Sequence, residues 1–333
     1  SAQPQVSKNS AGYYLWNVWD KNKGIFDLTK LIVGSQGTLG IITQAKIKLV
    51  KPKKYSDLLV IFMKDIKPLA EVVNHLLKFK PESLESYDDH TFKVALKFFG
   101  DIAKRLKGDL LTLAIKFLPE FWAVLTGGVP KLVMLAEFTG DDLNEVGIRI
   151  KAAQESLKEF NLKTKIEIGE EADKYWVVRR ESFNLLRHHV KNMRTAPFID
   201  DIIVRPEKLP EFLPRLYKIL DEYKDLTYTL VGHVGDGNFH VIPLVKLSEK
   251  NIAGIVTELS DKVFSLVLEY GGSITAEHND GLIRTPYLEK MFGSEIYNLF
   301  GEVKKIFDPD NIFNPGKKVG LTLEQSLKYL KVN

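Results

Sequence analysis

The chain alternates between short apolar runs and segments whose apolar residues recur every three or four positions. Runs of this length predict buried strands, and they cover residues 58–63, 132–138, 199–204, 228–233 and 239–245. The helical spacing predicts helices over residues 68–79, 141–160, 207–223 and 251–270. Strand–helix units that close on a hairpin predict an α+β domain, whose sheet is expected to be covered by helices on one face.

Residues before about 50 do not follow this pattern. They carry aromatic residues near the start and then a glycine-rich stretch, which suggests the end of another unit. The last long predicted helix stops at Gly271-Gly272, a common C-terminal signal. The residues after it are predicted to be mostly helical, with turns at prolines.

The composition limits which metal sites and nucleophiles this chain can contain, because none of the 333 residues is cysteine. Iron–sulfur clusters, Cys-ligated zinc and thiol nucleophiles are excluded on this chain, so a metal must be held by His, Asp or Glu. The net charge of +4 is small and lysines are interleaved with acidic residues, so no nucleic-acid surface is expected. The most apolar stretch, 110–125, is too interrupted for a membrane span. It is expected to be a buried helix, with a membrane-touching surface segment as the alternative.

Two histidines flank the most turn-prone segment of the chain, VGHVGDGNFH over residues 231–240. Residues 235–238, Gly-Asp-Gly-Asn, tolerate the backbone of a tight turn. His233 and His240 are therefore expected to face each other across a hairpin, close enough for both imidazoles to bind one metal. The alternative is an ordinary hairpin with two incidental histidines.

A second candidate is the pair Glu277-His278, which ends an apolar–polar alternation before a turn. Adjacent residues on an extended segment point to opposite sides, so one can ligate a metal while the other faces a separate cavity. Glu277 with His233 and His240 would make a two-His-one-carboxylate set, suited to Zn²⁺, Mn²⁺ or Fe²⁺. His278, with an ordinary pKa of about 6.5, is a natural acid–base group. The alternative is a surface loop with a charged pair.

Three further motifs are weaker on their own. The stretch GSQGTLG at 34–40 would let a backbone approach a ligand, but it matches neither the dinucleotide fingerprint nor the P-loop, and a structural turn is favoured. FDPDNIFNPGK at 307–317 contains two turns. Arg179, on a helix predicted from residue 171 to about 188, could bind a carboxylate in a bidentate way. A surface arginine is the favoured alternative.

Taken together and in this order, the motifs resemble the FAD-linked oxidase/dehydrogenase family with the vanillyl-alcohol-oxidase type of flavin fold. Within it, the D-lactate, glycolate and D-2-hydroxyglutarate dehydrogenases are most similar. The matching pieces are KNSAGY at 8–13, GSQGTLGIIT at 34–43, GHVGDGNFH at 232–240, AEHNDGLIRTPYLEKMFG at 276–293 and FDPDNIFNPGKK at 307–318.

The resemblance implies three parts: a C-terminal remnant of the two-lobed FAD-binding domain, a cap domain with an antiparallel sheet, and a segment that returns to the flavin site. These parts would be residues 1–52, 53–270 and 271–333. A pyrophosphate-cradling segment precedes KNSAGY in the family, and this sequence has no such segment there. The chain is therefore expected to be a fragment that binds FAD poorly or not at all by itself.

The resemblance also implies roles for individual residues. The metal ligands, for zinc or manganese, would be His233, His240 and Glu277, and His278 would take the substrate's hydroxyl proton. Substrate contacts would come from Arg179, then Arg194 and Arg284. Positions around the FAD would be Gly34, Thr38, Gly40, Ile42 and Asn314.

The implied reaction is oxidation of a D-2-hydroxy acid to the 2-oxo acid, by hydride transfer to FAD with the substrate chelated to the metal. The implied partners are that small acid and an electron acceptor: a quinone, a cytochrome, a flavoprotein or an iron–sulfur protein. A homodimer and a cytoplasmic location are further expectations, with peripheral contact at the inner membrane face as an alternative. Two other classes stay open: a non-redox, metal-holding substrate or partner module and, less favoured, a metal-dependent hydrolase.

Three positions depart from the family pattern. Ala276 and Asn279 stand where glycine flanks the Glu-His pair in the family, and Gln36 stands where glutamate is usual. Asn tolerates the left-handed backbone, so the turn after Glu277-His278 is expected to survive.

Overall fold

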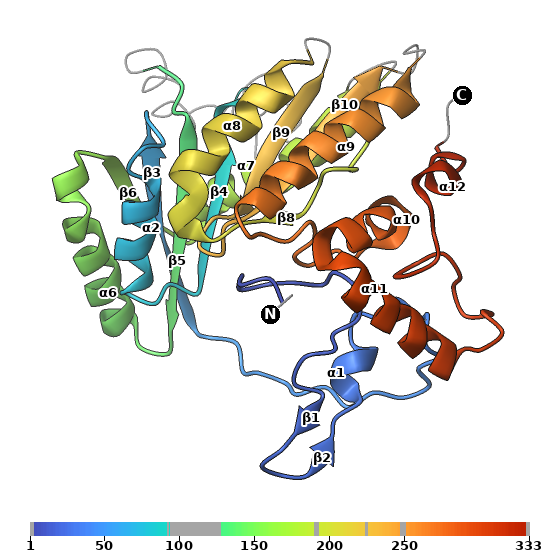
Figure 1. The fold of residues 1–333 in the computed structure, drawn as a ribbon. Coiled ribbons are helices and arrows are strands. Elements are labelled where there is room, and N and C mark those ends of the chain that lie inside the picture. Colours follow the sequence, from blue (N-terminus) through green and yellow to red (C-terminus); the bar gives the residue numbers. More distant parts are fainter. Residues whose placement is uncertain are drawn as a thin grey trace. The chain divides into compact units, whose positions relative to one another are not determined.

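The computed structural model describes residues 3–91, 93, 128–189, 193–223, 226–246 and 251–330 (Figure 1). Contacts within the chain group it into two compact units. The first unit comprises residues 1–50, 198–205 and 250–333, and the second comprises 51–197 and 206–249. The division into FAD-domain remnant, cap and C-terminal segment concerns function and stays a prediction. The apolar stretch 110–125 lies outside the described residues.

Seven strands of the second unit form an antiparallel sheet in the order β6-β3-β5-β4-β9-β10-β7. Their bounds are β3 Tyr55–Met63, β4 Ser83–Asp88, β5 Leu132–Gly140, β6 Lys163–Ile168, β7 Met193–Thr195, β9 Thr227–His233 and β10 Asn238–Lys246. The predicted α+β class with an antiparallel sheet is confirmed. The hydrophobic pattern missed β4 and β6, because charged residues interrupt both strands.

Helices cover both faces of this sheet, which corrects the expectation of one covered face. On one face α2 (Leu69–Leu77) contacts both α6 (Leu143–Ser156) and α8 (Leu209–Asp221) (Figure 1). On the other face α7 (Glu170–His189) packs its apolar side chains against β3, β4 and β5. The strand runs at 58–63 and 132–138 are apolar at nearly every position, as strands buried on both faces are.

Two short 3₁₀ helices, Lys158–Phe160 and Pro206–Lys208, complete the second unit's regular elements among the described residues. Asp142 caps the N-terminus of α6, which lies within the helix predicted over 141–160. The Asp142 side chain accepts hydrogen bonds from the backbone amides of Asn144 and Glu145, which satisfies donors that the first turn of a helix leaves free.

Most regular elements of the first unit are helices, and most of these lie in its C-terminal part. Its described elements are β1 Trp19–Asp20, β2 Ile25–Phe26, α1 Thr29–Ile32, β8 Ile202–Ile203, α9 Ile252–Glu269, α10 Gly281–Arg284, a 3₁₀ helix Thr285–Tyr287, α11 Leu288–Phe307 and α12 Leu323–Leu327. The strand predicted over 199–204 is shorter than expected, because only Ile202 and Ile203 have strand geometry. Among the described residues, none of the helices is both long enough and apolar enough to cross a membrane.

Residues 198–205 join the first unit through backbone hydrogen bonds. Ile203 and Ser273 exchange two N–H···O=C bonds of 3.0 Å each. A Cβ atom on Gly272 would lie 2.2 Å from the Ile203 carbonyl oxygen, so glycine is required for this close approach. The neighbouring segments 200–201 and 275–278 are thereby brought side by side.

Asp88, at the end of β4, is a fully buried carboxylate on the sheet face opposite α7. Oδ1 accepts a 2.9 Å hydrogen bond from the Thr91 amide, whereas Oδ2 has no partner among the described residues. Burial raises the pKa of Asp88 from 3.8 to about 6. Between these two values the native state binds more protons than the unfolded chain. The stability contributed by this group is therefore lost as pH rises through that window.

We expect Asp88→Asn to raise the free energy of unfolding at pH 7.5 by about 2 kcal/mol and to give no such gain near pH 3.5. The amide oxygen of Asn can still accept from Thr91, so only the buried charge is removed. Urea unfolding of both proteins at the two pH values measures the difference. An effect of equal size at both pH values would contradict the assignment.

Candidate functional site

The β9–β10 hairpin carries both predicted histidine ligands on one face of the second unit's sheet. The strand register pairs His233 with Asn238 and His240 with Val231. The histidines are therefore diagonal neighbours, which corrects the expectation of a facing pair. The turn takes only residues 234–237, which shifts the register by two residues from one that would pair His233 with His240. The rings still meet edge to face with centroids 5.5 Å apart, because residues two positions apart on a strand share a face.

Glu85 on β4 holds one of these histidines from the neighbouring strand. Its Oε1 lies 2.7 Å from His233 Nδ1, and its Oε2 accepts a 2.5 Å hydrogen bond from the Arg179 guanidinium. The Glu85 residue is 7% exposed. Sequence reasoning missed Glu85, because it belongs to no motif and its strand has no clear apolar pattern.

The predicted substrate arginines occupy different elements. Arg179 lies on α7, in the helix that was predicted for it, and its guanidinium is paired with Glu85. Arg194 lies on β7, opposite Val245 of β10. Arg284 is buried in the first unit, where it donates to the backbone carbonyls of Asp200 and Asn279. The guanidinium of Arg284 therefore stabilises the loop that contains Asn279.

In the first unit, Asp201 organises the Glu277-His278 loop. Its Oδ2 accepts hydrogen bonds from the Thr275 hydroxyl and from the amides of Glu277 and His278, at 2.7, 2.9 and 2.8 Å. Two successive amides that point at one oxygen bend the chain. An extended segment was expected here, with Glu277 and His278 pointing to opposite sides. The bend corrects this expectation, because it turns both side chains toward the same region. Their ligand atoms and a carboxylate oxygen of Asp201 lie within 4.8 Å of one another.

The preceding residue orients the histidine. Asp200 Oδ2 lies 3.0 Å from His278 Nδ1. This hydrogen bond is the main cause that raises the pKa of His278 above its ordinary value, and burial opposes it. Glu277 makes a 2.6 Å ion pair with Lys8. Sequence reasoning missed both aspartates, because they lie more than 70 positions before the loop.

The donor sets of both units suit a metal such as zinc or manganese. The His233–His240 pair offers imidazole nitrogens, and Glu277 offers a carboxylate. His233 also has a carboxylate on its other ring nitrogen, as metal-binding histidines usually have. These residues fit the implied group as chemical ligands.

The motifs that resemble flavin-contacting segments meet inside the first unit. Gln36 joins two of them, because its Oε1 accepts from the Gly281 amide and its carbonyl accepts from the Asn314 side chain, at 3.2 and 2.7 Å. Asn279 has a φ of 64°, so the expectation that asparagine preserves the left-handed turn is confirmed. A Cβ atom on Gly34, whose φ is 79°, would contact the Asn279 side chain at 3.4 Å.

The glycine-rich loop leaves its backbone approachable, as a bound cofactor requires. A Cβ atom at Gly37 or Gly40 would meet nothing within 4 Å, and Ile42 is 65% exposed. Thr38 is buried and hydrogen-bonds with the Tyr13 hydroxyl at 2.6 Å. The loop thus combines an anchored threonine with open glycine positions, an arrangement that fits close approach of FAD.

Two buried lysines hold these segments together. Lys318 Nζ lies within 2.9 Å of Ser10 O, Gly12 O, Asn279 Oδ1 and Asp280 Oδ2, and its side chain is fully buried. Lys304 donates to the carbonyls of Thr38 and Phe313 at 2.7 Å each and pairs with Asp308. In the sequence, Lys318 is visible only as the end of the motif at 307–318 and Lys304 only as part of a helical segment. Neither position indicates which groups the lysine binds.

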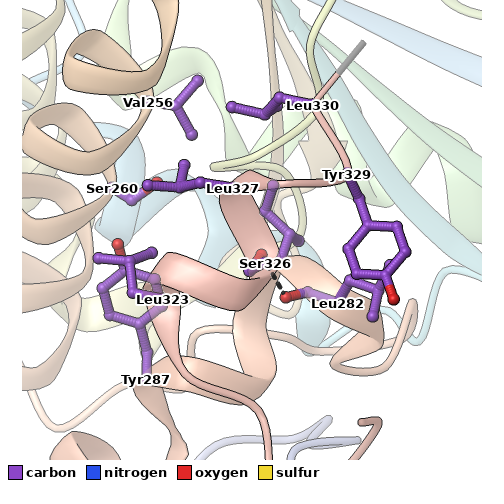
Figure 2. Close-up of a pocket in the computed structure, with 10 residues that line it drawn as sticks. Val256, Ser260, Leu282, Tyr287, Leu323, Ser326, Leu327, Tyr329 and Leu330 are labelled. Atoms are coloured by element: carbon purple, nitrogen blue, oxygen red, sulfur yellow. Dashed lines mark hydrogen bonds between the residues drawn. The ribbon is translucent and has the colours of Figure 1, made fainter. Parts of the chain in front are cut away.

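A small cavity of about 180 Å³ lies elsewhere in the first unit, between α9, α10 with the following 3₁₀ helix, and α12 (Figure 2). Its lining is mostly aliphatic, and its hydroxyls come from Ser260, Tyr287, Tyr329 and Ser326, the last bound to the Leu282 carbonyl. None of the residues predicted to bind metal, substrate or flavin lines this cavity. It therefore carries none of the predicted chemistry.

Comparison with known families gives one match that covers most of the chain. The family described as "FAD linked oxidases, C-terminal domain" matches residues 52–318. The D-2-hydroxyglutarate dehydrogenase of Pseudomonas putida is 30% identical over 322 residues, which cover 94% of this chain and 30% of that protein. The glycolate oxidase subunit GlcD of Bacillus subtilis is 30% identical over 297 residues, covering 88% and 57%. The D-lactate dehydrogenase of Archaeoglobus fulgidus is 29% identical over 303 residues, covering 90% and 59%.

The chain thus spans between 30% and 59% of the length of these three curated relatives. Among solved structures, an alkyldihydroxyacetonephosphate synthase superposes with a TM-score of 0.58 at 15% identity, over 86% of this chain and 49% of that one. A 4-ethylphenol oxidase from Gulosibacter chungangensis superposes with a TM-score of 0.57 at 12% identity, over 83% and 56%. At these identities the likeness shows the fold alone.

Proposed function

Because the chain belongs to the FAD-linked oxidases and matches their C-terminal domain, we propose that it forms part of an FAD-dependent dehydrogenase of D-2-hydroxy acids. The observation that carries this proposal is the agreement of three differently named relatives. Their names specify D-2-hydroxyglutarate, glycolate and D-lactate, which are all 2-hydroxy acids. The substrate would be a small acid of this class, oxidised to the 2-oxo acid.

His278 is proposed to accept the substrate's hydroxyl proton. Its Nδ1 is held by Asp200, so Nε2 is the nitrogen that can receive a proton. Arg179 is proposed to bind the substrate carboxylate, with Arg194 and Arg284 as further contacts. FAD, when bound, accepts the hydride from C2. Its proposed surroundings are Gly34, Thr38, Gly40, Ile42 and Asn314, and the meeting of their segments in the first unit supports this assignment.

His233, His240 and Glu277 are proposed as ligands of zinc or manganese. Such a metal lowers the pKa of a coordinated hydroxyl, which would assist proton removal by His278. The 5.5 Å approach of the two imidazoles supports this part of the proposal. The proposal also keeps residues 1–52, 53–270 and 271–333 as FAD-domain, cap and C-terminal parts. The electron acceptor is proposed to be a quinone, a cytochrome, a flavoprotein or an iron–sulfur protein.

We expect His233→Ala and His240→Ala each to remove bound zinc or manganese. In the complete FAD-containing enzyme, turnover of D-lactate, glycolate or D-2-hydroxyglutarate should fall by about 100-fold, because the hydroxyl is no longer activated. Metal analysis and reduction of an artificial electron acceptor measure the two effects. His75→Ala is the matched control, because His75 belongs to the same unit but pairs with Glu159 on its surface.

Full activity of the metal-free double variant would contradict the proposed metal site. A flavin absorbance scan during turnover tests the redox part separately. Metal binding without flavin reduction by any of the three acids would favour a non-redox binding module instead.

A further inference from the structure

Glu85 stands between two residues that the proposed function uses. One carboxylate oxygen contacts His233 on β9 and the other contacts Arg179 on α7, at 2.7 and 2.5 Å. We propose that Glu85 is a positioning residue, which fixes the proton of His233 on Nδ1 and so presents Nε2 as a metal ligand, while it also orients Arg179. This inference rests on the proposed function, because it deepens the assignment of His233 as a ligand.

The chemistry follows from what each group can donate. An ionised carboxylate only accepts hydrogen bonds, so a His233 nitrogen that bonds to it must carry the proton. In a neutral imidazole the other nitrogen then has the free lone pair, which is the form that binds a metal. Arg179 is always charged and lies beside the same carboxylate. Its guanidinium has only donors, so it occupies one acceptor oxygen of Glu85 and leaves the other for His233.

The surroundings of Glu85 argue that this arrangement is more than surface pairing. Glu85 is 7% exposed, and a buried carboxylate is costly unless it is paired. Its partners come from two other elements, 94 and 148 positions away in sequence. Exposed ion pairs contribute little stability. A buried carboxylate that divides its two oxygens between an arginine and a histidine specifies the orientation of both.

Glu85→Gln tests the proposal with little change in size. The amide group of Gln can donate to His233 Nδ1, and the imidazole proton would then move to Nε2, where it opposes metal binding. We expect nitrogen NMR of the metal-free protein at pH 8 to show this change of tautomer. Zn²⁺ affinity, measured by competition with a chelator, should fall about 10–100-fold, as is typical when a residue that hydrogen-bonds to a metal ligand is replaced.

Glu82→Gln is the matched control, because Glu82 lies three positions earlier, is exposed and accepts from the Thr139 hydroxyl. It should change neither the tautomer nor the Zn²⁺ affinity. Glu85→Asp keeps a carboxylate and should keep the Nδ1–H tautomer. Glu85→Ala removes both oxygens, and it replaces Glu85→Gln should that variant not fold. Circular dichroism of each variant verifies the fold.

The proposal is overturned when the Nδ1–H tautomer persists in Glu85→Gln, or when Glu82→Gln loses as much Zn²⁺ affinity. The proposed function fails in a different way, which is recognised when the unsubstituted protein binds neither Zn²⁺ nor Mn²⁺. In that case the metal site is contradicted, and the tautomer measurement still decides what Glu85 does to His233.

Discussion

Lys318→Met should lower the free energy of unfolding by about 3–5 kcal/mol, because it leaves the buried Asp280 carboxylate without its charged partner. Lys318 and Asp280 both have fully buried side chains. The ammonium group also lies within hydrogen-bond distance of two carbonyls of the first segment, Ser10 O and Gly12 O. Met has a similar length and the same cost in the left-handed backbone at this position, where φ is 69°. The loss is therefore that of the charge and its hydrogen bonds.

Lys317→Met is the matched control for this variant. Its ammonium group is exposed and, among the described residues, donates only to the nearby Pro315 carbonyl in a 3.3 Å contact. We expect its effect to be within about 0.5 kcal/mol, as for most surface substitutions. Urea unfolding of the three proteins measures both effects, and hydrogen exchange should show lost protection over residues 8–13 and 276–281 only for Lys318→Met. Equal effects of the two substitutions would contradict the role given to Lys318.

Asp201→Ala should lower turnover of the complete FAD-containing enzyme by about 100-fold and the free energy of unfolding of this chain by about 3 kcal/mol. The substitution removes the acceptor of three donors, the Thr275 hydroxyl and the amides of Glu277 and His278. Because these bonds bend the loop, their loss would release Glu277 and His278 from the geometry that places their ligand atoms together. Steady-state assays and urea unfolding measure the two effects.

Two further variants separate the causes. Asp201→Asn tolerates the left-handed backbone, where φ is 67°, and so isolates the loss of charge. It should lose less stability than Asp201→Ala. Asp20→Ala is the control in the same unit, because Asp20 also accepts from two amides, those of Asn22 and Lys23, but in an exposed turn. A loss of turnover in Asp20→Ala as large as in Asp201→Ala would overturn the assignment.

The fold could be predicted where apolar periodicity is strong. The strand runs at 58–63 and 132–138 and the helix capped by Asp142 correspond to β3, β5 and α6. Strands β4 and β6 escaped prediction, because pairing with neighbouring strands stabilises them despite their charged residues. The prediction that helices cover only one face of the sheet was wrong for a related reason. An apolar run shows that a strand is buried, but not which helix covers each side.

The site shows the same division between local and distant information. The hairpin and the left-handed turn at Asn279 depend on local backbone preferences, so the positions of glycine and asparagine in the sequence predicted both. The pairing of His233 with Asn238 instead of His240 depends on where the turn closes. The spacing of the two histidines was compatible with either register.

The sequence by itself determined the order and chemical type of the motifs, the absence of thiol chemistry and the resemblance to FAD-linked oxidases. Only the tertiary structure decided how these side chains are held: Glu85 against His233, Asp200 and Asp201 against the Glu277-His278 loop, and Lys318 between two segments about 270 positions apart. The reason is physical. Motifs and propensities report what a residue does with its near neighbours, whereas a buried hydrogen bond or ion pair depends on which distant segment folding brings within 3 Å of it.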